Sequence, residues 1–240
     1  MSLNPCSDAI LVEFVPPDQL LAISQLSKNP ETSSITASQA ARYRATYGRT
    51  EEILALAPDI VVADRFLPAP TRRALEKAGI AVFTVDIAST VEDSLAQVRA
   101  LADLARRTEE GDALADTVAE AWQQGGTEQE EPIVTLLWQE GGIVPGPDSL
   151  AAALLEHSGF SLHSATRGLA QGDYLPLEQV LADPPQLILS AGAARALHHP
   201  ALDALVGTAR EELDKRLLYC AGPVIPRALA RLREIREGLK

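Results

Sequence analysis

Long apolar runs and an excess of basic residues are both missing from this 240-residue chain. No apolar stretch reaches the roughly 18 residues of a membrane-spanning helix, so we expect no transmembrane segment. Lys and Arg total 21 against 33 Asp and Glu, which gives a formal net charge of −12. Nucleic-acid-binding domains need a basic footprint, so this balance argues against that class. The pattern of an export signal is missing too, and we expect such a signal to have been removed.

Sequence motifs for nucleotide binding and nucleophilic catalysis are missing as well. Gly141, Gly142 and Gly146 share one glycine- and proline-rich loop, but they lack the spacing of a phosphate loop or of GxGxxG. No GxSxG elbow is present, and no Ser/His/Asp arrangement can be argued from spacing. We therefore expect no catalytic residues and no cofactor. An enzyme with its chemistry in a cleft stays the alternative.

Histidine is scarce, and all four copies lie in the second half, at His157, His163, His198 and His199. A first-row metal site usually needs three or four converging ligands. Two adjacent histidines cannot both face one site from a regular element, and no carboxylate spacing completes a set. We interpret these residues as surface histidines and predict no metal site.

The two cysteines allow two interpretations. Cys6 opens the first half at a strand-to-helix turn, and Cys220 ends the last predicted strand. The carboxyl ends of parallel strands face the ligand crevice, so both thiols are expected to face one cleft. In an exported protein they could form a disulfide. We favour two separate thiols, because the sequence does not supply the Cα separation that a disulfide requires.

Two copies of one pattern are present, at residues 51–62 and 178–189, with a constant offset of 127 and no gap. Each copy reads as a short helix, a proline that stops it, and a wholly apolar strand. A strand that is apolar on both faces belongs inside a parallel sheet covered by helices. Two copies in register predict two related lobes.

A helical stretch over residues 89–124 separates these copies. Ser89 and Glu92 have the spacing of a capping box, and Gly125-Gly126 is a typical helix end. Gly111 predicts a bend, or a second helix start near Thr108. The stretch is either two ordinary surface helices or a connection between two lobes, and the flanking repeat favours the connection.

Strand and helix patterns alternate in both halves. The expected strands cover residues 20–23, 59–63, 80–85, 133–138, 186–189 and 216–220. Further helices are expected over residues 37–47, 71–78, 150–158, 200–206 and 226–239. Such alternation predicts an α/β fold with parallel sheets and helices on both faces.

Three segments then carry a resemblance to a known family: residues 50–63, the opening residues 2–8, and residues 221–223 with the final helix. They resemble periplasmic substrate-binding proteins with a helical backbone, which serve ABC importers for vitamin B12, ferric siderophores and haem. The resemblance covers essentially the whole chain and says little about the ligand. Related zinc and manganese binders have histidines in both lobes, and this chain has none before His157.

The resemblance implies two Rossmann-like lobes with parallel sheets, joined by a long α-helix, with a ligand cleft between them. It implies a monomer in the periplasm or another extracytoplasmic space, free or tethered to the membrane. Such a protein delivers an iron–siderophore or corrinoid ligand to the permease of an ABC importer. We predict an N-terminal lobe over 1–88, connecting helices over 89–127 with the backbone helix at about 108–124, and a C-terminal lobe over 128–240.

The family docks on its permease through an acidic residue on each lobe, and here the sequence departs from the pattern. Residues 68–73 hold no acid where the first-lobe acid is expected, and Arg72 and Arg73 are basic. Glu76 is the nearest candidate. The second-lobe candidates are Asp203, Glu211 and Glu212.

The predicted ligand contacts are residues that follow strands. From the first half they are Ser27, Tyr47, Arg65 and Phe66, and from the second half Trp138, Gln139, Arg167, Tyr174 and Arg195. Aromatic surfaces with a few polar groups suit a large, flat, partly apolar ligand. Arginines supply fork-shaped donors for carboxylates and other oxygen-rich anions. The alternative is that some are ordinary residues, with Trp138 in the core and Arg167 solvated.

Overall fold

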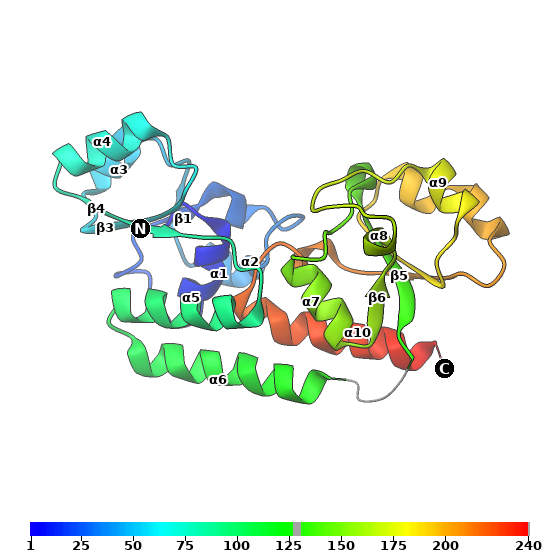
Figure 1. The fold of residues 1–240 in the computed structure, drawn as a ribbon. Helices are drawn as coiled ribbons and strands as arrows, with labels where there is room; N and C mark the ends of the chain where they lie inside the picture. The colour runs from blue at the N-terminus through cyan, green and yellow to red at the C-terminus, as the bar shows by residue number, and fades with distance from the viewer. Residues whose placement is uncertain (127–130, 240) are drawn as a thin grey trace. The chain divides into compact units, whose positions relative to one another are not determined.

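The computed structural model describes residues 1–126 and 131–239 (Figure 1). The chain divides into two compact units. Unit 1 comprises Met1–Ala88, Glu92–Val118 and Tyr219–Val224, and unit 2 comprises Ser89–Val91, Ala119–Leu218 and Ile225–Lys240. The predicted limit between residues 127 and 128 lies outside the described residues, so the proposed domain boundaries stay predictions. Helices and parallel strands alternate in each unit, which confirms the α/β fold class.

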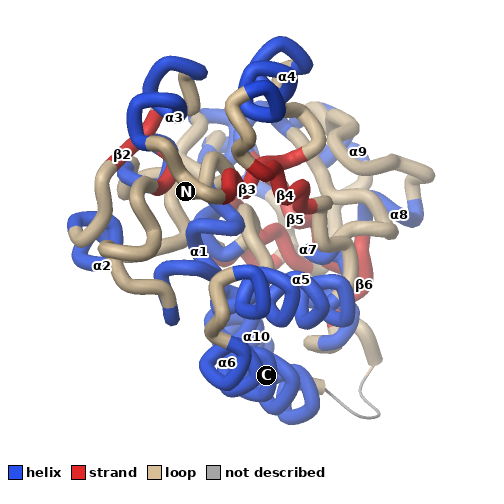
Figure 2. Tube along the Cα trace, turned by 90° about the vertical axis from the view of Figure 1, so that its left-hand side faces the viewer, coloured by secondary structure: helices blue, strands red, loops and turns tan. Residues whose placement is uncertain are grey.

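Unit 1 contains four parallel strands. They are β1 (Ile23–Ser24), β2 (Ala45–Thr46), β3 (Ile60–Asp64) and β4 (Ala81–Val85). β1 pairs with β2, and β3 lies beside β4 (Figure 2). Residues 1–3 join the two pairs, because the Ser2 N–H donates to Ala22 O at 3.0 Å and the Leu3 N–H to Val62 O at 2.9 Å. The first unit therefore has the order β2, β1, residues 1–3, β3, β4.

The helices of unit 1 flank this sheet or pack against one another. They are α1 (Pro5–Phe14), α2 (Ala37–Ala41), α3 (Thr50–Leu56), α4 (Ala69–Lys77), α5 (Val91–Leu104) and the first part of α6 (Thr108–Gly125), with 3₁₀ turns η1 (Gln25–Lys28) and η6 (Gly222–Val224). Ile53 of α3 and Leu75 of α4 are fully buried in one cluster with Val61, Ala63 and Ile80. Burial of each leucine, isoleucine or valine side chain in this cluster contributes about 1.5–3 kcal/mol to the stability of the fold.

Gly111 lies inside a continuous α6, so the predicted bend at this residue is wrong, while the second start near Thr108 is confirmed. A Cβ on Gly111 would come within 2.1 Å of the Ala102 Cβ. The glycine therefore permits close packing of α6 on α5, which run side by side in Figure 1. The chain instead turns after α5, where Arg106 has a positive φ of 55°.

Unit 2 has one four-stranded parallel sheet in the order β6-β5-β7-β8. Its strands are β5 (Ile133–Gln139), β6 (Phe160–Leu162), β7 (Leu187–Ala191) and β8 (Ala209–Glu212). Its helices are α7 (Leu150–His157), α8 (His163–Thr166), α9 (Leu177–Ala182), α10 (Ile225–Gly238) and the end of α6, with 3₁₀ turns η2 (Glu140–Gly142), η3 (Arg195–His198), η4 (Pro200–Ala204) and η5 (Lys215–Leu217). Leu136, Trp138, Val180 and Ile188 are buried in one of its core clusters.

The internal repeat is confirmed as a structural repeat. β3 begins at Ile60 and ends at Asp64, and β7 begins at Leu187 and ends at Ala191, both exactly 127 residues later. α3 and α9, the helices before them, also begin 127 residues apart. Each strand is central in its unit, and its apolar sequence on both faces reflects that position.

Two element predictions are wrong, and two further strands were not predicted. Residues 37–47 are helical only to Ala41, because Ala45 and Thr46 pair with β1 as β2. The strand predicted over 216–220 is absent, and its first residues belong to the 3₁₀ turn η5 (Lys215–Leu217). The last strand is β8, which was not predicted because its polar sequence Ala-Arg-Glu-Glu lacks the apolar pattern of a strand. The edge strand β6 was not predicted. Among the described residues, no helix combines the length and the apolar character needed to cross a bilayer.

Candidate functional site

A row of exposed apolar side chains follows the four strands of unit 1. Leu26 comes after β1, Tyr47 after β2, Phe66 after β3 and Ile87 after β4, each within two residues of the strand end. These four side chains are 64–72% exposed. Parallel strands have their carboxyl ends at the same edge of a sheet, so all four belong to that edge. Tyr47 and Phe66 were predicted as contacts, and Leu26 and Ile87 were not part of that prediction.

A carboxylate holds each of the first three strand-end turns. Asp8 accepts from the Ser24 N–H at 2.8 Å and from the Ser27 hydroxyl at 2.6 Å. Glu52 accepts from the Tyr47 N–H at 2.9 Å and also from a threonine hydroxyl. Asp64 accepts from the Phe66 N–H at 2.8 Å. Because these hydrogen bonds to carboxyl oxygens are present in the protein alone, the turns are fixed before any ligand arrives.

Ser27 is itself buried, and its hydroxyl supports the turn by donating to Asp8. Burial raises the pKa of its partner Asp8 to about 7, against hydrogen bonds from Ser24 and Ser27 that lower it. The hydrogen bond from Thr46 is the main cause of a lowered pKa at Glu52.

Two arginines accompany the aromatic side chains of this edge. The Arg49 guanidinium lies 5.5 Å from the ring centre of Tyr47, and that of Arg65 lies 5.9 Å from the ring centre of Phe66. Arg65 also faces Asp86 at 3.8 Å, with more than half of its side chain exposed. The predicted trio Tyr47, Arg65 and Phe66 is therefore present at one edge, as flat apolar faces with cationic neighbours.

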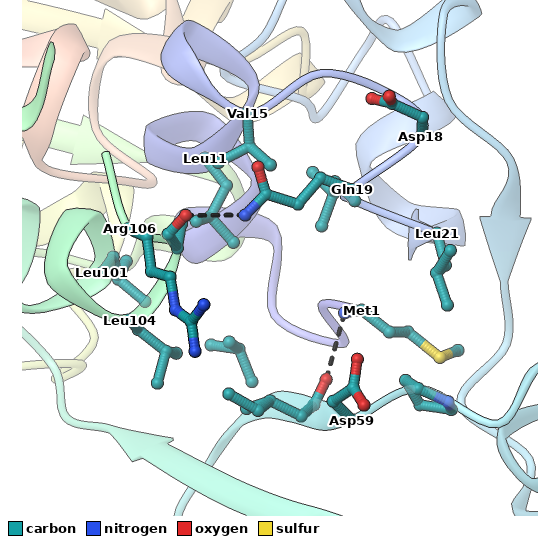
Figure 3. Close-up of a pocket in the computed structure, with 15 residues that line it drawn as sticks. Met1, Leu11, Val15, Asp18, Gln19, Leu21, Asp59, Leu101, Leu104 and Arg106 are labelled. Atoms are coloured by element: carbon teal, nitrogen blue, oxygen red, sulfur yellow. Dashed lines mark hydrogen bonds between the residues drawn. The ribbon is translucent and has the colours of Figure 1, made fainter.

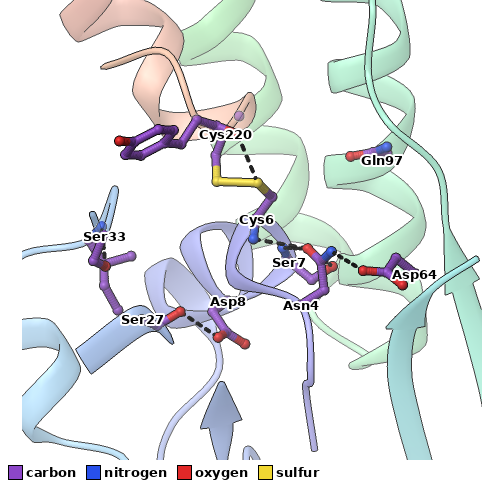
Figure 4. Close-up of a disulfide and its surroundings, with 12 residues drawn as sticks. Asn4, Cys6, Ser7, Asp8, Ser27, Ser33, Asp64, Gln97 and Cys220 are labelled. Carbon is purple, nitrogen blue, oxygen red and sulfur yellow. Dashed lines mark hydrogen bonds between the residues drawn. A yellow bond between two sulfur atoms is a disulfide. The ribbon is translucent and has the colours of Figure 1, made fainter. Parts of the chain in front are cut away.

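Figure 4 shows that Cys6 and Cys220 form a disulfide inside unit 1. Their Cα atoms are 5.0 Å apart, within the usual range for a disulfide. The interpretation of Cys6 and Cys220 as two separate thiols is therefore wrong. It was favoured because the sequence does not supply the Cα separation. The bond joins the start of α1 to residues 219–224. At that start Asn4 caps the helix and donates to Asp64 at 3.3 Å.

Unit 2 presents a second apolar surface at the carboxyl end of β5. The loop after β5 pairs with residues 172–175, through hydrogen bonds from the Val144 N–H to Asp173 O at 3.0 Å and from the Leu175 N–H to Gly142 O at 2.9 Å. Ile143 and Tyr174 lie opposite each other in this ladder. They are 41% and 61% exposed, so they form an accessible apolar pair.

Trp138 lies beneath this pair and is 1% exposed. Its indole N–H donates to Leu175 O at 3.0 Å, so the Trp138 side chain supports the loop from the core. This agrees with the alternative interpretation of Trp138 as a core residue. Gln139 is the last residue of β5 and half-buried, and its N–H donates to Ile143 O at 2.9 Å.

The side chain of Glu140 holds the turn that follows β7, the strand next to β5. Its carboxylate accepts from the Ala193 N–H at 3.2 Å and from Lys215 Nζ at 3.3 Å. The backbone bond from Ala193 is the main cause of a lowered pKa at Glu140. Arg195 begins η3 four residues after β7 and is exposed.

Arg167 has a separate environment. It donates to Asp183 at 2.6 Å and to Gln179 at 3.4 Å, and Asp183 directly follows α9, before β7 begins. His163 lies buried beside this pair, with Nε2 3.5 Å from Asp183, and burial lowers the pKa of its imidazole. The structure therefore places Gln139 at the end of β5 and Tyr174 beside the loop that follows it, while Arg167 pairs with Asp183 and Gln179.

The described residues contain no cluster of three or more His, Cys, Asp or Glu that is placed to hold a metal ion. The candidate docking acids differ in their availability. Asp203 pairs with Arg210, and Glu211 pairs with Arg231 at 3.1 Å. Glu212 keeps 83% of its side chain exposed. In unit 1, Glu76 is an exposed residue of α4.

Comparison with known sequences places these edges in a family context. The profile of a family described as periplasmic binding protein matches residues 1–206. A search of curated proteins found no match.

Solved structures with the same fold include several binding proteins. The periplasmic heme-binding protein BhuT, solved with two hemes, is 21% identical, with a TM-score of 0.75 over 97% of this chain and 95% of its own. HutB, a periplasmic heme-binding protein of Vibrio cholerae, is 18% identical, with a TM-score of 0.77 over 98% and 97%. BtuF, the periplasmic vitamin B12-binding protein of Vibrio cholerae, is 19% identical, with a TM-score of 0.74 over 100% and 96%. At these identities the likeness establishes the two-lobed fold and leaves the ligand open.

Proposed function

Because the chain belongs to the periplasmic binding protein family, we propose that it binds a metal chelate with a flat apolar body and an oxygen-rich periphery. Haem and a corrinoid have both features, and a ferric siderophore has the oxygen-rich periphery. The family consists of substrate-binding transport proteins, which confirms the prediction of a binding protein over that of an enzyme. The metal arrives inside the ligand, as cargo.

The observation that carries this proposal is the row Leu26, Tyr47, Phe66 and Ile87. These apolar side chains follow four strand ends and are exposed to water, so covering them with a ligand lowers the free energy. Ligand pockets are built from such apolar and aromatic surfaces with a few polar groups. Here the polar groups are Arg49 and Arg65, and Ile143 with Tyr174 offers a similar surface in unit 2.

The arginines favour a ligand with carboxylates or other anionic oxygens at its rim. Each guanidinium is close enough to an aromatic ring to be held over it, which reduces the entropy lost when it pairs with an anion. The prediction that one ligand contacts the edges of both units stays a prediction. The assignment of Arg167 and Arg195 as ligand contacts also stays a prediction.

Delivery to an ABC importer is the task of this family. For the permease contact in unit 2 we select Glu212, because its side chain is 83% exposed and lies 4.0 Å from His198, whereas Asp203 and Glu211 are paired with arginines. Glu76 is the selection in unit 1. The disulfide agrees with an extracytoplasmic compartment, since such bonds persist in oxidising environments. A monomeric state and the mode of membrane attachment are further parts of the proposal.

The test is a titration of the purified protein with hemin, cobalamin, a ferric hydroxamate and a ferric catecholate, followed by absorbance and calorimetry. We expect saturable binding of one ligand at micromolar or lower Kd, without chemical change of the ligand. Leu26→Ala should weaken that binding about tenfold, because burial of the lost methyl groups contributes roughly 1.4 kcal/mol or more.

Leu54→Ala is the matched control, since Leu54 is an exposed leucine on α3 of the same unit. It should leave the Kd unchanged. Equal losses in both variants would exclude the strand-end row as the contact surface. Chemical turnover of any ligand would support the alternative that the protein is an enzyme.

A further inference from the structure

The exposed apolar row of unit 1 has a gap at its centre. Its four side chains follow β1, β2, β3 and β4, and between these two pairs of strands lies the central segment, residues 1–3. That segment leads directly into α1, and residues 4–7 are Asn, Pro, Cys and Ser, which are half-buried or buried. Residues 4–7 therefore add no exposed apolar side chain between Leu26 and Phe66.

The start of α1 lies at the same edge of the sheet as the row. The helix runs back along the sheet, and its residue Leu11 and its C-cap Val15 line a cavity of about 690 Å³ (Figure 3). The same cavity is lined by Leu20–Leu21, just before β1, and by Pro58–Ile60, at the start of β3. The cavity thus marks the amino-terminal edge, and Cys6, near the other end of α1, belongs to the carboxyl edge.

The disulfide brings a tyrosine to this position (Figure 4). Tyr219 directly precedes Cys220, and its carbonyl oxygen lies 3.2 Å from Cys6 Sγ. Cys220 and Ala221 are each only 8% exposed, whereas Tyr219 is 42% exposed. A large aromatic side chain is therefore accessible to water next to the end of the central segment, where the row has its gap.

The residues after Tyr219 are anchored farther from this edge. The Gly222 N–H donates to Ser94 Oγ of α5 at 2.8 Å. A Cβ on Gly222 would lie 2.8 Å from Ile10 Cγ1, so the chain passes very close to α1. Ile10 is about one helical turn after Cys6. The disulfide and the Gly222 contacts together fix the direction of residues 219–224, with Tyr219 at the end nearest the row.

We propose that Tyr219 is a fifth ligand contact at the carboxyl edge of unit 1, and that the Cys6–Cys220 bond is the element that positions it. This inference rests on the proposed chelate function. With Tyr219 in the gap, a flat ligand meets apolar surface along the whole edge. A bond that holds the ring in place before the ligand arrives reduces the ordering cost of binding.

The contact is tested by measuring the Kd of hemin, cobalamin, a ferric hydroxamate and a ferric catecholate. Tyr219→Ala should weaken binding of whichever chelate the wild type binds by about tenfold, because the aromatic contact area is lost. Tyr219→Phe is the matched control, which keeps the ring and should stay within about twofold of the wild type. Circular dichroism confirms that each variant is folded. A wild-type Kd in Tyr219→Ala would overturn the contact.

The positioning role is tested by a double-mutant cycle. The variant Cys6→Ser, Cys220→Ser should weaken binding severalfold, and adding Tyr219→Ala to it should weaken binding little further, because the bond acts through the ring. A general structural effect of the missing bond would instead multiply with the loss of the ring. Independent losses, or an unchanged Kd without the bond, would overturn the positioning role.

A readout without ligand separates this inference from the proposed function. The four tyrosines are replaced by 3-fluorotyrosine, and the fluorine resonance of Tyr219 is assigned by its loss in Tyr219→Phe. In the variant without the disulfide this resonance should become narrower and move toward the position of an unfolded peptide. An unchanged resonance would overturn the positioning role.

The two proposals fail in different ways. If the wild type binds none of the four chelates, the proposed function fails and the contact role of Tyr219 fails with it. If the wild type binds a chelate and Tyr219→Ala binds it equally well, only the inference about Tyr219 is overturned.

Discussion

Asp8 is a buried carboxyl group that ties stability to pH. In the folded protein its pKa is raised from 3.8 to about 7, chiefly by burial. Between these two values the folded state holds a proton that the unfolded chain has released. Its contribution to stability is therefore complete below pH 3.8 and is lost as the pH rises toward 7.

We expect Asp8→Asn to remove this dependence. One amide oxygen can take the place of Oδ2, which receives the hydrogen bonds from Ser24 and Ser27, and the side chain cannot ionise. The free energy of unfolding of the variant, relative to the wild type, should rise by roughly 4 kcal/mol between pH 4 and pH 8. Urea unfolding across this range is the measurement. Parallel curves for the two proteins would contradict the expectation, and Asp18→Asn serves as the exposed control.

Gly142 and Gly141 form a matched pair for the apolar surface of unit 2. Both have a positive φ, of 79° and 76°. A Cβ on Gly142 would lie 2.3 Å from the Tyr174 ring, whereas a Cβ on Gly141 meets nothing within 4 Å. Gly141→Ala should cost only about 1–2 kcal/mol of backbone strain. Gly142→Ala should cost more and displace Tyr174, so it should weaken ligand binding as well.

Thermal unfolding and chelate titration of both variants distinguish these costs. If both variants bind the ligand equally well, Tyr174 is not a contact. If both lose the same stability, the ring does not limit the space at Gly142.

Among the elements, the central repeat was predictable, and the edges of the sheets were not. β3 and β7 are apolar on both faces because each is covered by helices, and that pattern is visible in the sequence. β8 is polar, and only its pairing with β7 makes it a strand. β2 has two residues inside a pattern typical of a helix, so its partner β1 decides its conformation.

The disulfide is the connection between elements that the sequence left open. Cys6 begins α1, and Cys220 lies in the segment 219–224, which is also held by a hydrogen bond from the Gly222 N–H to Ser94 at 2.8 Å. A bond across 214 residues restricts the unfolded chain strongly. The double variant Cys6→Ser, Cys220→Ser should therefore lose about 2–5 kcal/mol of stability.

Denaturant unfolding with and without a reductant checks this. The reductant should lower the stability of the wild type to that of the double variant, which itself should not respond. A wild type that is indifferent to reductant, with two free thiols by mass spectrometry after alkylation, would contradict the pairing.

For the whole chain, the sequence predicted the fold class and the surfaces on which to search for the site. Tyr47, Phe66 and Tyr174 were predicted as contacts because residues after parallel strands commonly face a ligand, and the structure shows that all three are exposed. Trp138 shows the limit of that rule, because the burial of its indole depends on Leu175, which is 37 residues away. Leu26, Ile87 and Ile143 are aliphatic, and only their exposure in the folded chain distinguishes them from core residues.

Self-association of the whole chain is governed by two opposing terms. The net charge of −12 repels a second copy, while the exposed row after the strands of unit 1 attracts one. We expect a monomer of 25.6 kDa at about 0.15 M salt. About 1 M salt shortens the screening length to roughly 3 Å, so weak self-association should then appear at high protein concentration.

A bound chelate should abolish this association, because it covers the same side chains. Sedimentation velocity at both salt concentrations, with and without the ligand identified by titration, is the measurement. Leu26→Ala should weaken the association and Leu54→Ala should not. Association that persists in the presence of ligand would mean that copies meet through another surface, and the row would then have no part in self-association.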